Sequence, residues 1–200
     1  MTPNVIKESS RGYQSFLIDD VLFEDREIFL TEEVNKDTCA SLIKQLLFLE
    51  KQSSDKEIRF YINSPGGDVY SGLAVYDCIR LMKSPVTTIC IGTAASMGSI
   101  LFLAGEKRQM LPNSRIMIHD PSFGGGNLAG KKPHQIKTEL DDLIEVQECL
   151  CNIIADRTGK TPDEIRELTK DDTYFNVSEA IDFGLATEEI KSILRKENIL

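Results

Sequence analysis

The central stretch of the chain, residues 84–105, contains no Asp, Glu, Lys, Arg or His. An uncharged run of this length has to be buried, either in a membrane or in a protein core. Three glycines and several Ser and Thr residues interrupt it, whereas a membrane-spanning helix needs about 20 continuous apolar residues. We therefore predict a buried strand over residues 86–91 and a short buried helix over residues 97–104, with Ser96 at their junction.

Strands and helices are predicted to alternate through the middle of the chain. Residues 57–62 and 115–118 have the composition of buried strands, and apolar residues recur at helical spacing over 69–79 before Ser84-Pro85 ends that helix. Strands separated by helices of this length favour right-handed β-α-β units. The predicted fold class is therefore α/β with a mostly parallel sheet.

Two longer helices are predicted on either side of this region. The first begins at Asn35, and the second spans residues 135–157, about 35 Å at 1.5 Å per residue, between Pro133 and Gly159. A helix of this length after the glycine-rich segment 122–133 indicates a projecting arm. The expected apolar positions are Leu42, Ile43, Leu46, Leu47 and Leu49 on the first, and Ile136, Leu140, Leu143, Ile144, Leu150 and Ile154 on the second. A further helix is expected to begin at the capping-box sequence Thr161-Pro162-Asp163-Glu164.

The composition argues against several classes of partner. The chain has 32 acidic and 23 basic residues, a formal charge of −9, and no basic cluster longer than Lys131-Lys132, so we expect binding neither to nucleic acid nor to membranes. The N-terminus lacks the apolar core of a signal peptide, which favours a cytoplasmic protein. Five cysteines, an odd number without CxxC spacing, are interpreted as reduced packing residues with no disulfide or zinc role.

The sequence around Ser96, GTAASMGS over residues 92–99, suggests a nucleophile. A serine at a strand-to-helix turn exposes its Oγ, and small neighbours let a substrate backbone approach closely. The stretch differs from the G-x-S-x-G elbow by Ala94 in place of the first glycine. A small serine in an ordinary tight turn, with no catalytic role, would look the same.

An activated serine needs a general base, and the chain has two histidines. His119 follows the strand at residues 115–118, at the carboxyl end where sites in parallel sheets form. His134 lies at the start of the long helix, so His119 is the better candidate, although a structural histidine could occupy the same place. The carboxylate that would orient this histidine cannot be chosen by spacing. Asp120, Asp171 and Asp172 all remain open.

Backbone donors for an oxyanion are predicted in NSPGG, residues 63–67. The Gly66-Gly67 backbone has no Cβ and can present an N–H to a substrate oxygen, and the Met97 N–H beside the nucleophile supplies a second donor. The same sequence also favours an ordinary β-turn. Ser64 is an alternative nucleophile, but it precedes a proline inside the turn and ranks below Ser96.

Several stretches in order along nearly the whole chain resemble one family, the proteolytic subunit of the Clp protease (ClpP). The matching segments are VIKESSRG, QLLFLE, FYINSPGGDV, GLAVYDCI, GTAASMGS, LPNSRIMIHDP and SEAIDFGLAT. The resemblance implies a crotonase-like α/β fold in one domain over residues 1–200. Its head would consist of repeated β-α-β units, with an N-terminal axial segment at about 1–17 and a handle helix within about 122–158. It also implies stacked heptameric rings that form a tetradecamer.

By position, the resemblance assigns Ser96 as the nucleophile, His119 as the base, and Gly67 and Met97 as the oxyanion donors. Asp172 becomes the orienting acid because it precedes Glu179-Ala180 as in the family. The implied activity is that of a serine endopeptidase that cleaves unfolded polypeptides. An AAA+ Clp unfoldase would deliver them and would use the ATP, so this subunit itself is expected to need no cofactor or metal.

Two other functions stay open. An acyl-CoA enzyme of the crotonase type shares the fold, but it would need carboxylates at the reacting carbon and a CoA site. A specialised paralogue, inactive alone, could act as a structural or regulatory ring in a mixed complex with a second ClpP chain.

Four departures from the family motivate the second alternative. Segment 122–132 is longer than usual, the segment near 105–109 is shorter, and Lys170-Asp171 reverses the usual order of charges. Arg59 and Gln109 replace aromatic residues in the cleft that receives the unfoldase, where Tyr61, Ile89 and Ile91 remain. We expect altered ring pairing or unfoldase choice from these changes.

Overall fold

The computed structural model describes residues 3–10, 12–123 and 130–192, and its centre is a mostly parallel sheet. The order along the sheet is β3-β4-β5-β6-β9; β7 pairs in parallel with the far part of β5, and β8 pairs antiparallel with β7. This arrangement confirms the predicted α/β class. The strands are β3 (Glu27–Leu30), β4 (Ile58–Ser64), β5 (Val86–Ala95), β6 (Lys107–Met110), β7 (Arg115–Ile118), β8 (Thr173–Phe175) and β9 (Glu188–Glu189).

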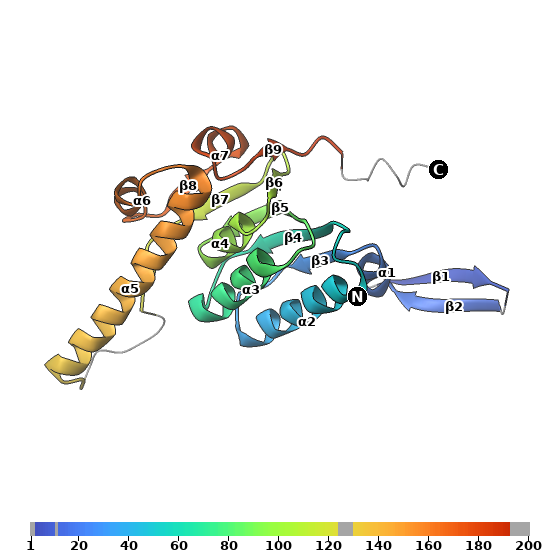
Figure 1. The fold of residues 1–200 in the computed structure, drawn as a ribbon, viewed down its shortest axis with the longest axis horizontal. Helices are drawn as coiled ribbons and strands as arrows, with labels where there is room; N and C mark the ends of the chain where they lie inside the picture. Colours follow the sequence, from blue (N-terminus) through green and yellow to red (C-terminus); the bar gives the residue numbers. More distant parts are fainter. Residues whose placement is uncertain (1–2, 11, 124–129, 193–200) are drawn as a thin grey trace.

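Three helices, α2 (Lys36–Gln52), α3 (Val69–Leu81) and α4 (Met97–Leu103), lie side by side against the sheet (Figure 1). Asn35 caps α2 in a capping box with Thr38, as its position before the apolar repeat predicts. Leu42, Leu46 and Leu49 are buried, but Leu47 is 55% exposed. The inclusion of Leu47 in the packed face was wrong, because neighbouring helix positions are about 100° apart and cannot all face the sheet.

Strand β5 is longer than expected. Its last residue is Ala95, directly before Ser96. The sequence suggested that the strand ends at Ile91, before the small residues. Residues 93–95 instead pair with β7, and a register irregularity with β4 lies between Ile62 and Ser64. The partner strand comes from more than twenty positions further along the chain, so local pattern alone could not show that the strand continues.

The uncharged stretch forms the core of the protein. Every residue of α4 is buried, and so are Ile89 and Cys90 in the middle of β5. Within the described ranges no helix is long and apolar enough to cross a membrane. The stretch that resembled a membrane segment is thus a strand and a helix surrounded by protein.

Two extensions leave this body in opposite directions (Figure 1). One is the antiparallel hairpin β1 (Asn4–Ser9) and β2 (Gly12–Leu17), which α1 (Ile18–Glu24) follows. The other is α5 (Pro133–Thr158), whose 26 residues give a length of about 39 Å.

The fully buried residues of α5 all lie in its last third. Its buried residues are Leu150, Cys151, Ile154 and Ala155, whereas Leu140 and Ile144 are 46% and 43% exposed. The predicted apolar stripe exists, but within one protomer its first part is not covered. Of the glycine-rich segment 122–133, residues 124–129 lie outside the described residues.

The chain after α5 returns to the edge of the sheet. Helix α6 (Pro162–Leu168) begins with the predicted capping box between Thr161 and Glu164, and α7 (Val177–Phe183) follows β8. The pairing of β8 with β7 brings the loop before Thr173 next to Ile118. It therefore lies beside His119, the residue that follows β7.

Candidate active site

Ser96 lies at the junction of β5 and α4 with a backbone conformation that is rare for a serine. Its φ is 52° and its ψ is −123°, outside the regions open to most side chains. Its N–H donates to the Met117 carbonyl at 2.9 Å, and its own carbonyl accepts from the Ser99 N–H at 2.9 Å. The sharp turn is therefore held from both sides, and it presents Oγ away from the sheet.

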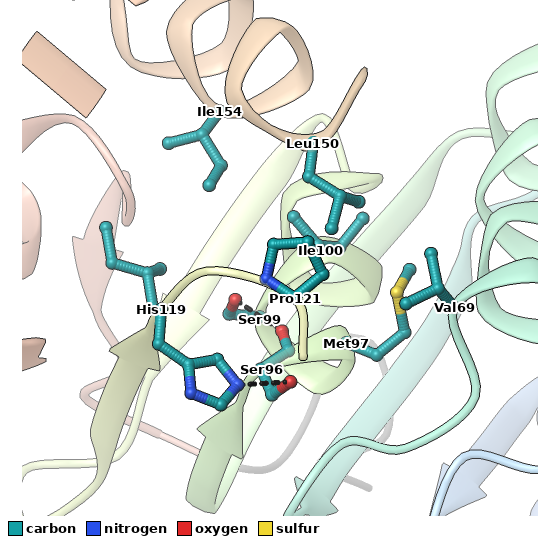
Figure 2. A pocket seen from close by; sticks show the side chains of 10 residues that line it. Val69, Ser96, Met97, Ser99, Ile100, His119, Pro121, Leu150 and Ile154 are labelled. Atoms are coloured by element: carbon teal, nitrogen blue, oxygen red, sulfur yellow. Dashed lines mark hydrogen bonds between the residues drawn. The ribbon is translucent and has the colours of Figure 1, made fainter. Parts of the chain in front are cut away.

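His119, the residue after β7, contacts both of its expected partners. Its Nε2 is 2.9 Å from Ser96 Oγ, and its Nδ1 is 2.9 Å from Asp172 Oδ1 (Figure 2 shows the first contact). Both hydrogen bonds form at once when Nδ1 carries the proton and donates to the carboxylate, because Nε2 then accepts from the serine hydroxyl. This tautomer is the one that a general base acting on Ser96 requires.

The structure separates the three aspartates that spacing alone left open, of which the family resemblance pointed to Asp172. Asp172, in the loop between α6 and β8, is the one that reaches His119. The Asp120 carboxylate instead accepts hydrogen bonds from Thr169 and Gln147, and the Asp171 side chain is exposed to solvent. The pairing of β7 with β8 selects among the candidates.

The Gly66-Gly67 turn lies directly beside Ser96. A Cβ placed on Gly66 would lie 2.6 Å from Ser96 Cβ and 2.9 Å from the Met97 nitrogen, so only glycine allows this approach. The Gly66 N–H already donates to Ser64 Oγ at 3.2 Å. In the part of the chain that the structure describes, the N–H groups of Gly67 and Met97 have no acceptor. They are free to bind a substrate oxygen.

Ser64, the alternative nucleophile, and His134, the alternative base, lie elsewhere. Ser64 is completely buried, and its Oγ donates to the Glu32 carbonyl at 2.5 Å while it accepts from Gly66. Its role is to shape the glycine turn. His134 is exposed in the first turn of α5, away from the Ser96 contacts.

A mainly apolar cavity opens beside the Ser96 hydroxyl (Figure 2). Helix α5 contributes Leu150 and Ile154, so the buried end of the arm forms part of the site. The remaining apolar lining residues are Val69, Met97, Ile100, Ile118 and Pro121. A cavity of this composition, next to a hydroxyl and a histidine, fits an apolar side chain of a substrate.

The cysteines and the acidic and histidine side chains are the alternative reactive or metal-binding groups among the described residues. No group of three or more His, Cys, Asp or Glu side chains there could hold a metal ion. All five cysteines are free, and burial raises the pKa of each thiol above its ordinary value. A thiol with a raised pKa is a poor nucleophile at neutral pH, so Ser96 has no competitor among them.

The residues that replace family aromatics are engaged within the chain. Arg59 is 6% exposed, pairs with Glu27 at 3.2 Å and stands 5.2 Å from the Tyr61 ring centroid. Gln109 donates to Glu188 at 3.0 Å. Arg59 and Gln109 are therefore engaged in polar contacts beside an apolar cluster that includes Tyr61 and Ile89.

Lys170 pairs with Glu167 of the same chain at 2.5 Å. Both side chains are more than half exposed, so water competes with this pair and leaves it weak. The long segment at 122–132 is described only up to residue 123 and from residue 130, and its expected effect on ring pairing stays a prediction.

Two contacts near the site had no signal in the sequence. Thr169 and Gln147 hold the carboxylate of Asp120, although no motif marked either residue. Their positions follow from the packing of α5 against α6 and from the pairing of β8 with β7, which periodicity within each helix does not reveal.

A comparison with protein families gives an independent result. The family model described as Clp protease matches residues 10–192. This range includes every residue of the site and all of the described structure beyond the first strand. Members of this family generally form rings and work with AAA+ unfoldases. The chain belongs to the Clp protease family.

Proposed function

We propose that this chain is the serine endopeptidase subunit of a barrel-shaped, ATP-dependent protease. The observation that carries the proposal is the continuous hydrogen-bonded chain from Ser96 Oγ through His119 to Asp172. In this proposal the rings are stacked heptamers, and an AAA+ unfoldase delivers unfolded polypeptide and hydrolyses ATP. The protease subunit itself uses neither nucleotide nor metal.

Acylation begins when His119 Nε2 takes the Ser96 hydroxyl proton and Oγ attacks the peptide carbonyl. Asp172 holds the imidazole in the correct tautomer and stabilises the imidazolium that forms. The carbonyl oxygen becomes an oxyanion and accepts hydrogen bonds from the N–H groups of Gly67 and Met97. Collapse of the tetrahedral intermediate breaks the C–N bond, and His119 gives its proton to the leaving amine.

Deacylation repeats the same steps with water. His119 Nε2 takes a proton from water, the resulting hydroxide equivalent attacks the ester carbonyl, and the oxyanion binds the same two N–H groups. Ser96 leaves and recovers its proton from His119. The products of the two steps are an amine, a carboxylic acid and the regenerated enzyme.

The cavity beside Ser96 supports a preference for apolar residues at the position before the cleaved bond. Among the described residues, its lining contains no Asp, Glu, Lys or Arg side chain. A charged substrate side chain would lose its hydration there without gaining a partner. We therefore expect cleavage after Leu or Met to exceed cleavage after Asp or Lys.

The test is hydrolysis of short fluorogenic peptides by the purified protein, with Ser96→Ala as the control and the assembly mass measured in parallel. We expect Ser96-dependent cleavage by a species of ring mass. Serine-independent cleavage would overturn the assignment of Ser96. A folded ring that shows no cleavage would overturn the proposal that the chain is active by itself.

The polar contacts that Arg59 makes with Glu27 and Tyr61 favour a second candidate, a regulatory ring that needs a different partner ring. In that case the three side chains would be present, but they would hydrolyse peptide only in a mixed complex. A fluorophosphonate probe separates the two, because it labels an activated serine without the need for peptide binding in the chamber. Labelling of Ser96 in the isolated protein supports the peptidase, and labelling only after a second ring is added supports the regulatory subunit.

A further inference from the structure

The contact between His119 and Asp172 is open to water. The His119 side chain is 30% exposed and that of Asp172 is 58% exposed. Hydrogen bonds and ion pairs at such exposure hold their partners weakly, because water competes for the same groups. A site that depends on accurate alignment of Ser96, His119 and Asp172 therefore needs some other contact to fix the last two.

Asp120, the residue after His119, makes such contacts. Its N–H donates to the Thr169 carbonyl at 2.7 Å, and its Oδ1 accepts from Thr169 Oγ1 at 2.5 Å. Thr169 is 2% exposed and comes three residues before Asp172. Two hydrogen bonds, both to the buried residue Thr169, thus join the segment of His119 to the segment of Asp172 independently of the exposed pair.

The other carboxylate oxygen of Asp120 connects this link to the long helix. Oδ2 accepts from Gln147 Nε2 at 2.6 Å. Gln147 belongs to α5, one turn before Leu150, which lines the cavity beside Ser96. The position of α5 is therefore connected to the histidine segment both through the cavity and through this amide.

We propose that Asp120 is a positioning residue. It fixes the position of His119 relative to Asp172 through Thr169, and it links both to α5 through Gln147. The inference rests on the proposed function, because alignment matters only if these side chains act together. Asp120 itself does not touch the reacting atoms. Its effect is on the fraction of time that the three side chains are aligned, so its loss lowers kcat more than it raises KM.

Hydrogen bonding and charge can be separated at this position. Asn at residue 120 keeps an acceptor for Thr169. Its NH2 group can donate to Gln147 if the glutamine amide flips and presents its carbonyl oxygen. Leu has a similar size but makes neither contact. If Asp120 acts through hydrogen bonds, D120N retains activity and D120L loses it. If it acts through its charge on His119, both variants lose activity alike.

The kinetic experiment compares kcat and KM for matched pairs of variants in the full assembly. For D120L we expect kcat to fall about 10- to 100-fold with KM changed less than about 3-fold, which is the scale of an alignment error near 1 Å. T169V, which lacks the hydroxyl, should lose about 10-fold, and T169S should recover it. Q147L should lose less than T169V, and its exposed neighbour E148L serves as the control with kcat unchanged.

A spectroscopic measurement tests the inference without turnover. The chain has only two histidines, so ring-nitrogen labelling of histidine gives two sets of signals, which the H119A variant assigns. We expect a hydrogen-bonded Nδ1–H signal of His119 in the wild type and in D120N, in solid-state NMR spectra of the assembly. The same signal should be lost to exchange with solvent in D120L and T169V.

The outcomes distinguish this inference from the proposed function. Wild-type protein that shows the predicted NMR pattern without peptide hydrolysis would refute the function and keep the positioning role. Active protein in which D120L keeps the Nδ1–H signal and wild-type kcat would refute the positioning role alone. Equal losses of kcat in D120N and D120L would also overturn it, because the charge of Asp120 and not its hydrogen bonds would then be responsible for the effect.

Discussion

The two ends of helix α4 are held in opposite ways. At its first residue the chain leaves Ser96 with a positive φ, a glycine turn packs against it, and the N–H groups of Gly67 and Met97 are left for a substrate. At its other end the carbonyl groups are fully used. Arg157 donates to the carbonyls of Leu103 and Gly105 at 2.9 and 2.6 Å.

A second arginine, the buried Arg108, extends the same pattern beyond α4. It is 8% exposed and donates to the carbonyls of Leu185 and Gly184 at 2.7 and 3.1 Å. Burial lowers the pKa of Arg108 to about 10, and the charges of Arg157 and Arg80 act in the same direction. Within the described residues neither Arg108 nor Arg157 has a carboxylate in ion-pair distance, so backbone carbonyls take that place.

This contrast shows how one short helix serves both chemistry and stability. Backbone strain and unpaired N–H groups at the Ser96 end cost stability, and they are the features that a substrate oxygen can use. Charge-assisted hydrogen bonds at the far end offset that cost, because each saturates a carbonyl that would otherwise be buried without a partner. Changes at the first end should therefore affect activity, and changes at the second should affect stability.

Among variants that keep Ser96, the largest effect is expected from Gly66→Ala at the catalytic end. The new Cβ would lie 2.6 Å from Ser96 Cβ, at a φ of 94° that also disfavours alanine. Peptide hydrolysis should fall by about 1000-fold, because Ser96 and the Met97 N–H are displaced together. Gly159→Ala is the matched control, since its φ of 74° is similarly positive but nothing lies within 4 Å. Equal activity in the two variants would contradict the close approach.

Arg108→Met should show the reverse pattern. It removes the donor from the buried Leu185 carbonyl and from the partly buried Gly184 carbonyl, so the free energy of unfolding should drop by about 3 kcal/mol. Turnover per folded molecule should change less than about 3-fold, as measured by denaturant unfolding and peptide hydrolysis at one protein concentration. Arg115→Met, at an exposed position on β7, is expected to stay within about 0.5 kcal/mol. Loss of turnover without loss of stability would place Arg108 in the site instead.

Replacement of Ser96 by Gly and by Ala separates the strain from the chemistry. Both variants should be inactive, but glycine tolerates the φ of 52° and alanine does not. We expect Ser96→Gly to be more stable than Ser96→Ala by about 1 kcal/mol, as measured by denaturant unfolding. A more stable alanine variant would show that the backbone at this turn stores no strain.

The smallest effect is expected inside the first turn of α4. The Ser99 hydroxyl donates to the Ser96 carbonyl at 2.7 Å, but the same carbonyl also accepts from the Ser99 N–H. Ser99→Ala should therefore cost at most about 1 kcal/mol of stability and leave kcat within about 2-fold. A larger loss of kcat would mean that the hydroxyl, which lines the cavity, acts on the substrate directly.

The sequence by itself determined the α/β class, the buried strand and helix around Ser96, and the helix starts at Asn35 and Thr161. These features follow from hydrophobic periodicity and capping chemistry, which act between residues close along the chain. The same local rules led to Ser96, His119, and the glycine turn as candidates, because strand ends and small residues can be identified in a single segment.

Only the tertiary structure decided how far β5 extends, what Asp120 contacts and by which contacts Asp172 reaches His119. Spacing left three aspartates open and the family resemblance pointed to Asp172, whose loop the pairing of β7 with β8 brings to the histidine. The last residues of β5 are strand because a later segment supplies their hydrogen bonds. These outcomes depend on contacts between segments far apart in sequence, which no spacing rule within one segment encodes.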